Sequence, residues 1–263
     1  MIIIWEMTNS KIYFCSFGKG KPVIFLHGIL GTHSQWIPFV KDFSDHRLIF
    51  PDLPNHGRSS HIPSMDYDEV AKILYEWIHS EKINKIKLVG HSFGGKVAIQ
   101  LVKNYPDIFE KLILVDSSSE KFSMSLSLNL WINAIEKIPL SNYSTYAEAK
   151  IFFEREGIPE KEQELLLKNI QRNKNQLEWR SNVLGIIQNI EDVLSEIHIP
   201  IPIIIPTYLI RGEDSTYISD NMLFKMQKNF PLLKETTVSS AGHWVHVDNR
   251  TEFAQKLQIF LSE

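Results

Sequence analysis

The residues best suited to chemistry lie in the stretch LVGHSFGGKVA, residues 88–98, where a lone serine, Ser92, stands at a corner between two patterns. A β-favouring run stops at Gly90, and a helical pattern begins directly after the serine. The order strand, G-x-S-x-G, helix is typical of a nucleophile elbow, a strained turn that exposes the serine hydroxyl. Gly90 and Gly94 occupy the positions where a side chain would collide. The pattern predicts that Ser92 is a nucleophile; a turn that serves packing alone stays open, and the spacing does not fit a phosphate-binding loop.

A serine hydroxyl needs a base to take its proton, and such a base is expected on a loop after the last strand. The loop AGHWVH supplies His243. His246 lies three residues later and fits better as a surface or core histidine. The pair has H-x-x-H spacing, but no third ligand stands at a matching distance, so we expect no metal, and the chemistry needs no cofactor.

Negative charge on the reacting oxygen requires two backbone N–H donors. One donor is expected from Phe93, directly after the candidate nucleophile, and the other from Ile29 in the loop FLHGILG. Gly28 gives that loop freedom to turn, and His27 is interpreted as a structural histidine that braces it.

An acid must orient the histidine, and two carboxylates are candidates. Asp116 ends the predicted strand in LVDSSS, and Asp214 lies in the loop after TYLIRG. The position three residues beyond that glycine, where such an acid commonly lies, is Ser215. We favour Asp116, because an uncompensated carboxylate at the end of a buried strand would be costly. Asp214 remains the alternative acid.

Strands and helices alternate along the chain, which favours a mostly parallel, doubly wound sheet flanked by helices. Because ligands bind beyond the carboxyl ends of such strands, the loops that carry Ser92 and His243 are expected at one edge of the sheet. The strands are predicted near residues 2–6, 11–17, 22–26, 47–51, 85–89, 111–116, 207–212 and 235–238. The helices are predicted from about residue 34, over 66–79, 93–104 and 219–229, and from about residue 250.

The long segment 118–205 interrupts this alternation between the sixth and seventh strands. It has little strand character and is rich in Glu, Lys, Asn and Leu, so we predict a helical cap inserted into a core made of residues 1–117 and 206–263. Met124, Leu128 and Trp131 recur at near-helical spacing. They could line an acyl pocket or pack the cap onto the core.

Composition narrows the class of protein further. The chain has 263 residues, 43% hydrophobic content and a formal net charge of -3, with no basic run, so nucleic acid is not an expected partner. The single cysteine, Cys15, cannot form an internal disulfide, and the start MIIIWEMTNS lacks the pattern of a signal peptide. No apolar run approaches the ~18 residues of a membrane span. These features predict a cytoplasmic protein, and they leave its oligomeric state undetermined.

The ordered set LHGILGTHSQW, DLPNHGRSSHIPSMDY, VGHSFGGKVA, LILVDSSS, LEWRSN, RGEDSTYI and AGHWVHVD resembles α/β-hydrolases, and more narrowly the small carboxylesterases of the YbfF type. The resemblance implies the α/β-hydrolase fold and a triad of Ser92, His243 and Asp116. The sequence departs from the family at Pro54, where arginine is usual, and at Glu213-Asp214, where small polar residues are usual.

The function predicted from these residues is a serine hydrolase that cleaves small-molecule carboxylic esters, or thioesters, of short to medium acyl chains. A carbon–carbon bond hydrolase and a cofactor-free perhydrolase would use the same three side chains. A binding protein that has lost turnover belongs to a different class and also stays open.

Overall fold

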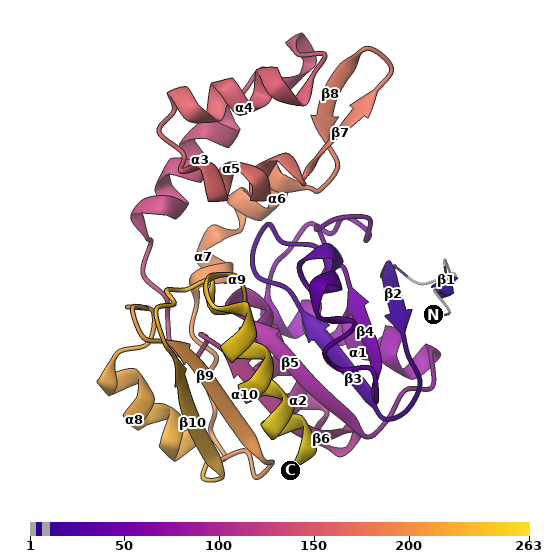
Figure 1. Ribbon diagram of the computed structural model, residues 1–263, viewed down its shortest axis with the longest axis vertical. Helices are drawn as coiled ribbons and strands as arrows, with labels where there is room; N and C mark the ends of the chain where they lie inside the picture. The colour runs from indigo at the N-terminus through magenta and orange to yellow at the C-terminus, as the bar shows by residue number, and fades with distance from the viewer. Residues whose placement is uncertain (1–3, 7–10) are drawn as a thin grey trace.

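The computed structural model describes residues 4–6 and 11–263. Within these residues the central sheet has eight strands in the order β1-β2-β4-β3-β5-β6-β9-β10 (Figure 1). They are β1 (Ile4–Glu6), β2 (Phe14–Phe17), β3 (Pro22–Leu26), β4 (Arg47–Pro51), β5 (Ile86–His91), β6 (Phe109–Val115), β9 (Thr207–Gly212) and β10 (Leu233–Val238). Strand β2 runs antiparallel to β1 and β4, and the other neighbours are parallel. The predicted mostly parallel sheet is confirmed.

Helices cover both faces of this sheet. They are α1 (Tyr67–Ser80), α2 (Phe93–Asn104), α8 (Asp220–Asn229), α9 (Val245–Asp248) and α10 (Arg250–Ser262), with the short 3-10 helices η1 (His33–Gln35), η2 (Ile37–Phe39) and η3 (Pro106–Ile108). Ile24 and Leu26 of β3 pack in the layer that contains α1 and α2, whereas Val23 and Phe25 pack in the layer that contains α10. Alternate strand residues therefore serve two cores, as expected of a sheet covered on both sides.

The predicted element boundaries agree closely where the local signals are strong. Helix α2 covers the predicted 93–104, and Asp66 begins α1 by accepting hydrogen bonds from the backbone of Asp68 and Glu69. The helix expected from about residue 34 is wrong in type, because this segment forms η1 and η2 instead. Pro38 has no backbone N–H and so cannot donate within a longer α-helix. Of the first two predicted strands, residues 2 and 3 lie outside the described residues.

The segment between β6 and β9 stands above the carboxyl ends of the strands (Figure 1). It contains α3 (Leu126–Lys137), η4 (Leu140–Asn142), α4 (Tyr146–Arg155), α5 (Glu160–Leu167), α6 (Val183–Gln188) and α7 (Ile190–Leu194), and a hairpin of β7 (Ile170–Asn173) and β8 (Gln176–Trp179). The sequence did not predict this hairpin, because its strands are only four residues long and largely polar. In the described part of the chain, no helix is long and apolar enough to cross a membrane.

Candidate active site

Ser92 lies at the turn between β5 and α2. Its backbone has φ 52° and ψ -120°, a conformation that is strained for a residue with a side chain. A Cβ atom on Gly90 would lie 2.4 Å from the carbonyl oxygen of Gly94, and one on Gly94 would lie 2.4 Å from that of His27. Only glycine fits these two positions, so G-x-S-x-G follows from the close approach of the backbone around the turn.

Three side chains that are far apart in the sequence meet at this turn. His243 Nδ1 lies 2.7 Å from Asp116 Oδ2, and His243 Nε2 lies 2.9 Å from Ser92 Oγ. A carboxylate can only accept, so Nδ1 carries the ring proton and donates to Asp116, which leaves Nε2 to accept from the Ser92 hydroxyl. Asp116 is fully buried directly after β6. This is the proton arrangement that a serine nucleophile with a histidine base requires.

The alternative acid, Asp214, lies in the loop after β9 and, within the described residues, does not contact the His243 ring through a hydrogen bond. Its side chain is exposed, and its backbone N–H donates to the carbonyl of Ala241 at 2.9 Å. Among the described residues, no hydrogen bond or ion pair joins Asp214 to His243. Ser215, at the common acid position, instead donates its hydroxyl to Asp116 Oδ2 at 2.5 Å.

The two residues expected to stabilise the oxyanion come from different segments, Phe93 from the turn after Ser92 and Ile29 from the loop after β3. Phe93 is the first residue of α2, so its backbone N–H belongs to the helix end whose donors have no partner within the helix. Ile29 and Gly28 line the cavity in front of Ser92. His27 holds their loop: Nδ1 lies 2.9 Å from the carbonyl of Gly28, and Nε2 accepts the backbone N–H of Leu53 at 3.0 Å. Burial lowers the pKa of His27 to about 4, so its imidazole is neutral and braces the loop.

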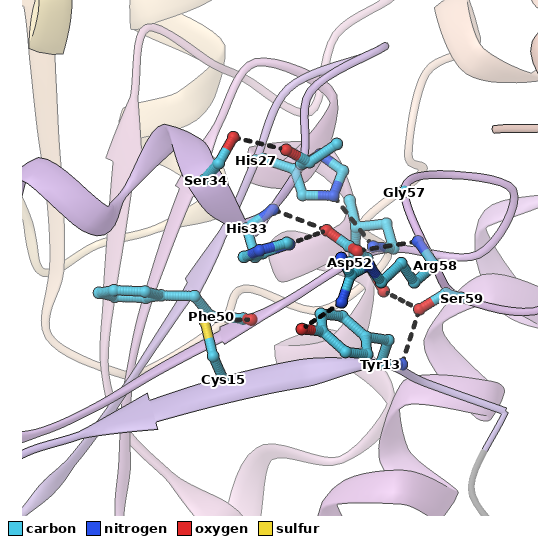
Figure 2. A network of polar contacts seen from close by, with 12 residues as sticks. Tyr13, Cys15, His27, His33, Ser34, Phe50, Asp52, Gly57, Arg58 and Ser59 are labelled. Carbon is cyan, nitrogen blue, oxygen red and sulfur yellow. Dashed lines mark hydrogen bonds and ion pairs between the residues drawn. The ribbon is translucent and has the colours of Figure 1, made fainter. Parts of the chain in front are cut away.

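A buried carboxylate, Asp52, supports this loop from below (Figure 2). It accepts the backbone N–H of His33 at 2.7 Å, His33 Nδ1 at 2.9 Å and the backbone N–H of Arg58 at 2.9 Å. Burial alone would raise the pKa of Asp52, but the hydrogen bonds and charge of His33 outweigh it and hold the pKa below its ordinary value. Gly57 has φ +55°, and a Cβ there would overlap the carboxylate. The motif DLPNHGRSS therefore fixes the loop that carries Ile29.

A cavity of roughly 230 Å³ opens over Ser92 between the core and the cap. Of the three residues predicted for an acyl pocket, Leu128 and Trp131 lie in its wall. Met124 lies in a neighbouring hollow, together with Met222, and not in this cavity.

Two aromatic side chains beside His243 were missed by the sequence reasoning. The ring of Tyr217 stacks on the His243 imidazole, with centroids 3.5 Å apart and planes at 11°. His91 Nε2 donates to the His243 backbone carbonyl at 2.9 Å, and burial lowers the pKa of His91 well below its ordinary value. His246 is buried and neutral: neither ring nitrogen has a hydrogen-bond partner among the described residues, and burial lowers its pKa to about 3. Tyr217 lies in the segment RGEDSTYI after β9, and no spacing within that segment indicates that its ring stacks on the histidine.

No group of three or more His, Cys, Asp or Glu side chains that could hold a metal ion occurs in the described ranges, 4–6 and 11–263.

The elbow after β5 and the histidine after β10 are features of the alpha/beta hydrolase fold. The chain belongs to this family, whose model matches residues 21–250, which include the cap.

Named relatives narrow the class. Over 254 residues the chain is 30% identical to the sn-1-specific diacylglycerol lipase ABHD11 of Danio rerio, a match that covers 93% of this chain and 79% of that protein. It is 26% identical over 246 residues to esterase YbfF of Escherichia coli, which covers 93% and 94% of the two chains. A solved marine microorganism esterase superposes with a TM-score of 0.91 at 33% identity, over 95% of this chain and 98% of that one. The resemblance to YbfF-type proteins is confirmed, and these relatives support a hydrolase of the esterase type.

Proposed function

We propose that this protein is a serine hydrolase that cleaves carboxylic esters, and thioesters by the same chemistry, of short to medium acyl chains. The observation that carries the proposal is the hydrogen-bonded series Asp116, His243, Ser92, with distances of 2.7 and 2.9 Å, at the floor of a cavity.

In the proposed reaction, Ser92 Oγ attacks the substrate carbonyl while His243 Nε2 takes the hydroxyl proton. The negative charge that forms on the carbonyl oxygen is stabilised by the backbone N–H groups of Ile29 and Phe93. The imidazolium, held by Asp116, then gives its proton to the leaving alkoxide or thiolate, and an acyl-serine remains. His243 next removes a proton from water, which attacks the acyl carbon. The bond to Ser92 Oγ then breaks, Oγ takes the proton from His243, and the acid is released.

The size of the cavity supports the chain-length limit. The cavity of roughly 230 Å³ is bounded on one side by cap residues, which limits the room for a long acyl chain. Leu128 and Trp131 give its wall apolar surface. We therefore expect faster turnover of butyryl and hexanoyl esters than of long-chain triglycerides. A marked increase in rate on emulsified lipid would contradict this.

The nucleophile is tested by labelling. A fluorophosphonate probe should modify the protein once, at Ser92, and Ser92→Ala should abolish both labelling and hydrolysis of p-nitrophenyl esters. A wild-type protein that is inert to the probe and to every ester would favour a binding protein.

The acid is tested with Asp116→Asn and Asp214→Asn side by side, with thermal melts as the control for folding. Loss of the group that fixes the histidine tautomer lowers kcat by up to roughly 10⁴-fold, whereas loss of an exposed carboxylate should cost about tenfold or less. If Asp214→Asn is the crippled enzyme and Asp116→Asn turns over normally, the assignment is wrong.

A further inference from the structure

The candidate site contains a carboxylate that the proposed reaction does not use. Glu162, on the cap helix α5, lines the same cavity as Ser92 and His243. Trp131 Nε1 donates to Glu162 Oε2 at 2.7 Å, and the hydroxyl of Ser127 donates to Oε1 at 3.0 Å. The carboxylate is therefore held in a fixed position in the cap side of the cavity.

The anchor is built from one face of α3. Ser127 and Trp131 are four residues apart, so their side chains point the same way and reach the two oxygens of one carboxylate. Both donors are neutral, so they orient the charge of Glu162 without cancelling it.

Among the described residues that line the cavity, none is a permanent cation that would offset this charge. The described lining holds no lysine or arginine, and no ion pair joins Glu162 to one in the described residues. Lys161, the neighbour in sequence, pairs with Asp248 instead. His91 is neutral, because burial lowers its pKa well below the ordinary value. Burial also raises the pKa of Tyr217; a hydrogen bond with Ser125 opposes that rise, and the charges of Asp116 and, less strongly, Glu162 add to it.

We propose that Glu162 is a specificity-determining residue that restricts the site to acyl groups without a negative charge. The inference rests on the proposed function, since it concerns which acyl chains enter the same cavity. An uncharged acyl chain gains contact with Leu128 and Trp131, whereas a terminal carboxylate would be brought close to the half-buried carboxylate of Glu162, and the two like charges repel. The protein therefore favours simple aliphatic acyl esters over half-esters of dicarboxylic acids.

The test compares two esters with the same six-carbon acyl chain, p-nitrophenyl hexanoate and mono-p-nitrophenyl adipate, at neutral pH. Adipate is chosen because shorter dicarboxylate half-esters hydrolyse themselves through cyclic anhydrides. The quantity measured is the ratio of kcat/KM for hexanoate to kcat/KM for adipate. We expect wild type to favour hexanoate by at least about thirtyfold and Glu162→Gln to reduce that ratio by about tenfold or more, since the variant removes a like charge from the cavity that receives the acyl chain.

The variant preserves the anchor. The amide oxygen of glutamine can accept from Trp131, and its NH₂ group can donate to the Ser127 hydroxyl, which also accepts. Glu164→Gln is the matched control, because Glu164 is exposed on the same helix and does not line this cavity. It removes one negative charge outside the cavity, and the ratio should change by less than about twofold.

The outcomes separate the two proposals. An unchanged ratio in Glu162→Gln, or an equal change in Glu164→Gln, overturns the role of Glu162, while hydrolysis of the hexanoate ester by wild type still supports the proposed function. Wild-type protein that cleaves neither ester overturns the proposed function and this inference with it.

Discussion

His246 is a buried histidine outside the candidate triad, and its replacement should make the protein less sensitive to acid. Its ring packs against Trp36 and Phe253, with centroids 4.9 and 6.1 Å away, and neither of its nitrogens has a hydrogen-bond partner among the described residues. Burial, with a smaller effect from the charge of His243, lowers its pKa from 6.5 to about 3. The native imidazole therefore stays neutral at a pH where the unfolded one takes a proton.

The sign of the effect follows from the lowered pKa. The unfolded chain binds more protons than the native one between pH 6.5 and about 3, so the stability that His246 supports is complete above pH 6.5 and is lost as the pH falls. When the pH falls from about 7.5 to about 5.5, protonation of this imidazole stabilises the unfolded chain, and so lowers the free energy of unfolding, by about 1.4 kcal/mol. His27 and His56, with pKa values lowered to about 4 and about 3, should add similar amounts.

The assay is urea unfolding of wild type and His246→Leu at these two pH values. Leucine has a similar volume, and no hydrogen bond is lost. We expect the free energy of unfolding of the variant to fall by about 1.4 kcal/mol less than that of wild type over this range. The exposed His61, replaced by glutamine, is the control for the loss of any histidine. An acid dependence equal to that of wild type would refute the reasoning, and loss of esterase activity in the variant would point to His246 as the base.

Three further predictions follow from contacts around the site. Tyr217→Leu removes the ring that stacks on His243 and should lower kcat about tenfold with little change in KM. Tyr217→Phe keeps the ring, and its kcat should stay within about threefold of wild type. Steady-state kinetics on p-nitrophenyl hexanoate measure both variants. Burial lowers the pKa of Lys96 to about 7, so above that pH the unfolded chain binds more protons than the native one. The free energy of unfolding of wild type should therefore rise by about 2 kcal/mol between about pH 7 and about pH 9. Urea unfolding of Lys96→Met should lack that gain, and an equal gain would contradict the lowered pKa. Asp52→Asn places an amide NH₂ among three N–H donors and should lower the free energy of unfolding by about 2 to 3 kcal/mol, measured by urea titration. A loss below about 0.5 kcal/mol would contradict the role of the buried network in Figure 2.

The features predicted well from the sequence are those that depend on short stretches of chain. The elbow is one strand, one tight turn and one helix, and its glycines are required by backbone contacts within a few residues of Ser92 or across one neighbouring loop. The parallel sheet follows from the alternation of buried strands with helices. His243 could be located because the sheet order requires the loop after the last strand to reach the same edge.

The features that were missed depend on contacts between distant segments. Glu162 enters the cavity because α5 packs beside α3, and nothing in its own neighbourhood of glutamates and leucines distinguishes it from Glu164. Tyr217 is recognised only by the ring that it stacks on. Met124 shares the near-helical spacing of Leu128 and Trp131, but it precedes the N-cap residue Ser125 and so lies outside α3. It therefore lines a different hollow from Leu128.

The position of Asp116, the proposed acid, shows how strand register can favour one candidate where sequence spacing leaves two. Strands β5 and β6 pair in register up to His91 and Val115, so Ser92 and Asp116 are the next residues at two neighbouring strand ends. The distance between them is set by the spacing of strands, about 4.8 Å, which one imidazole can bridge. Strand β9 continues on the other side of β6, and Ser215 from its loop reaches the same carboxylate. Either strand end could therefore present an oxygen to the histidine. We place the acid at the end of the inner strand, because a buried carboxylate is stable only when hydrogen-bond donors surround it. Asp116 has two such donors, the hydroxyl of Ser215 and the ring N–H of His243.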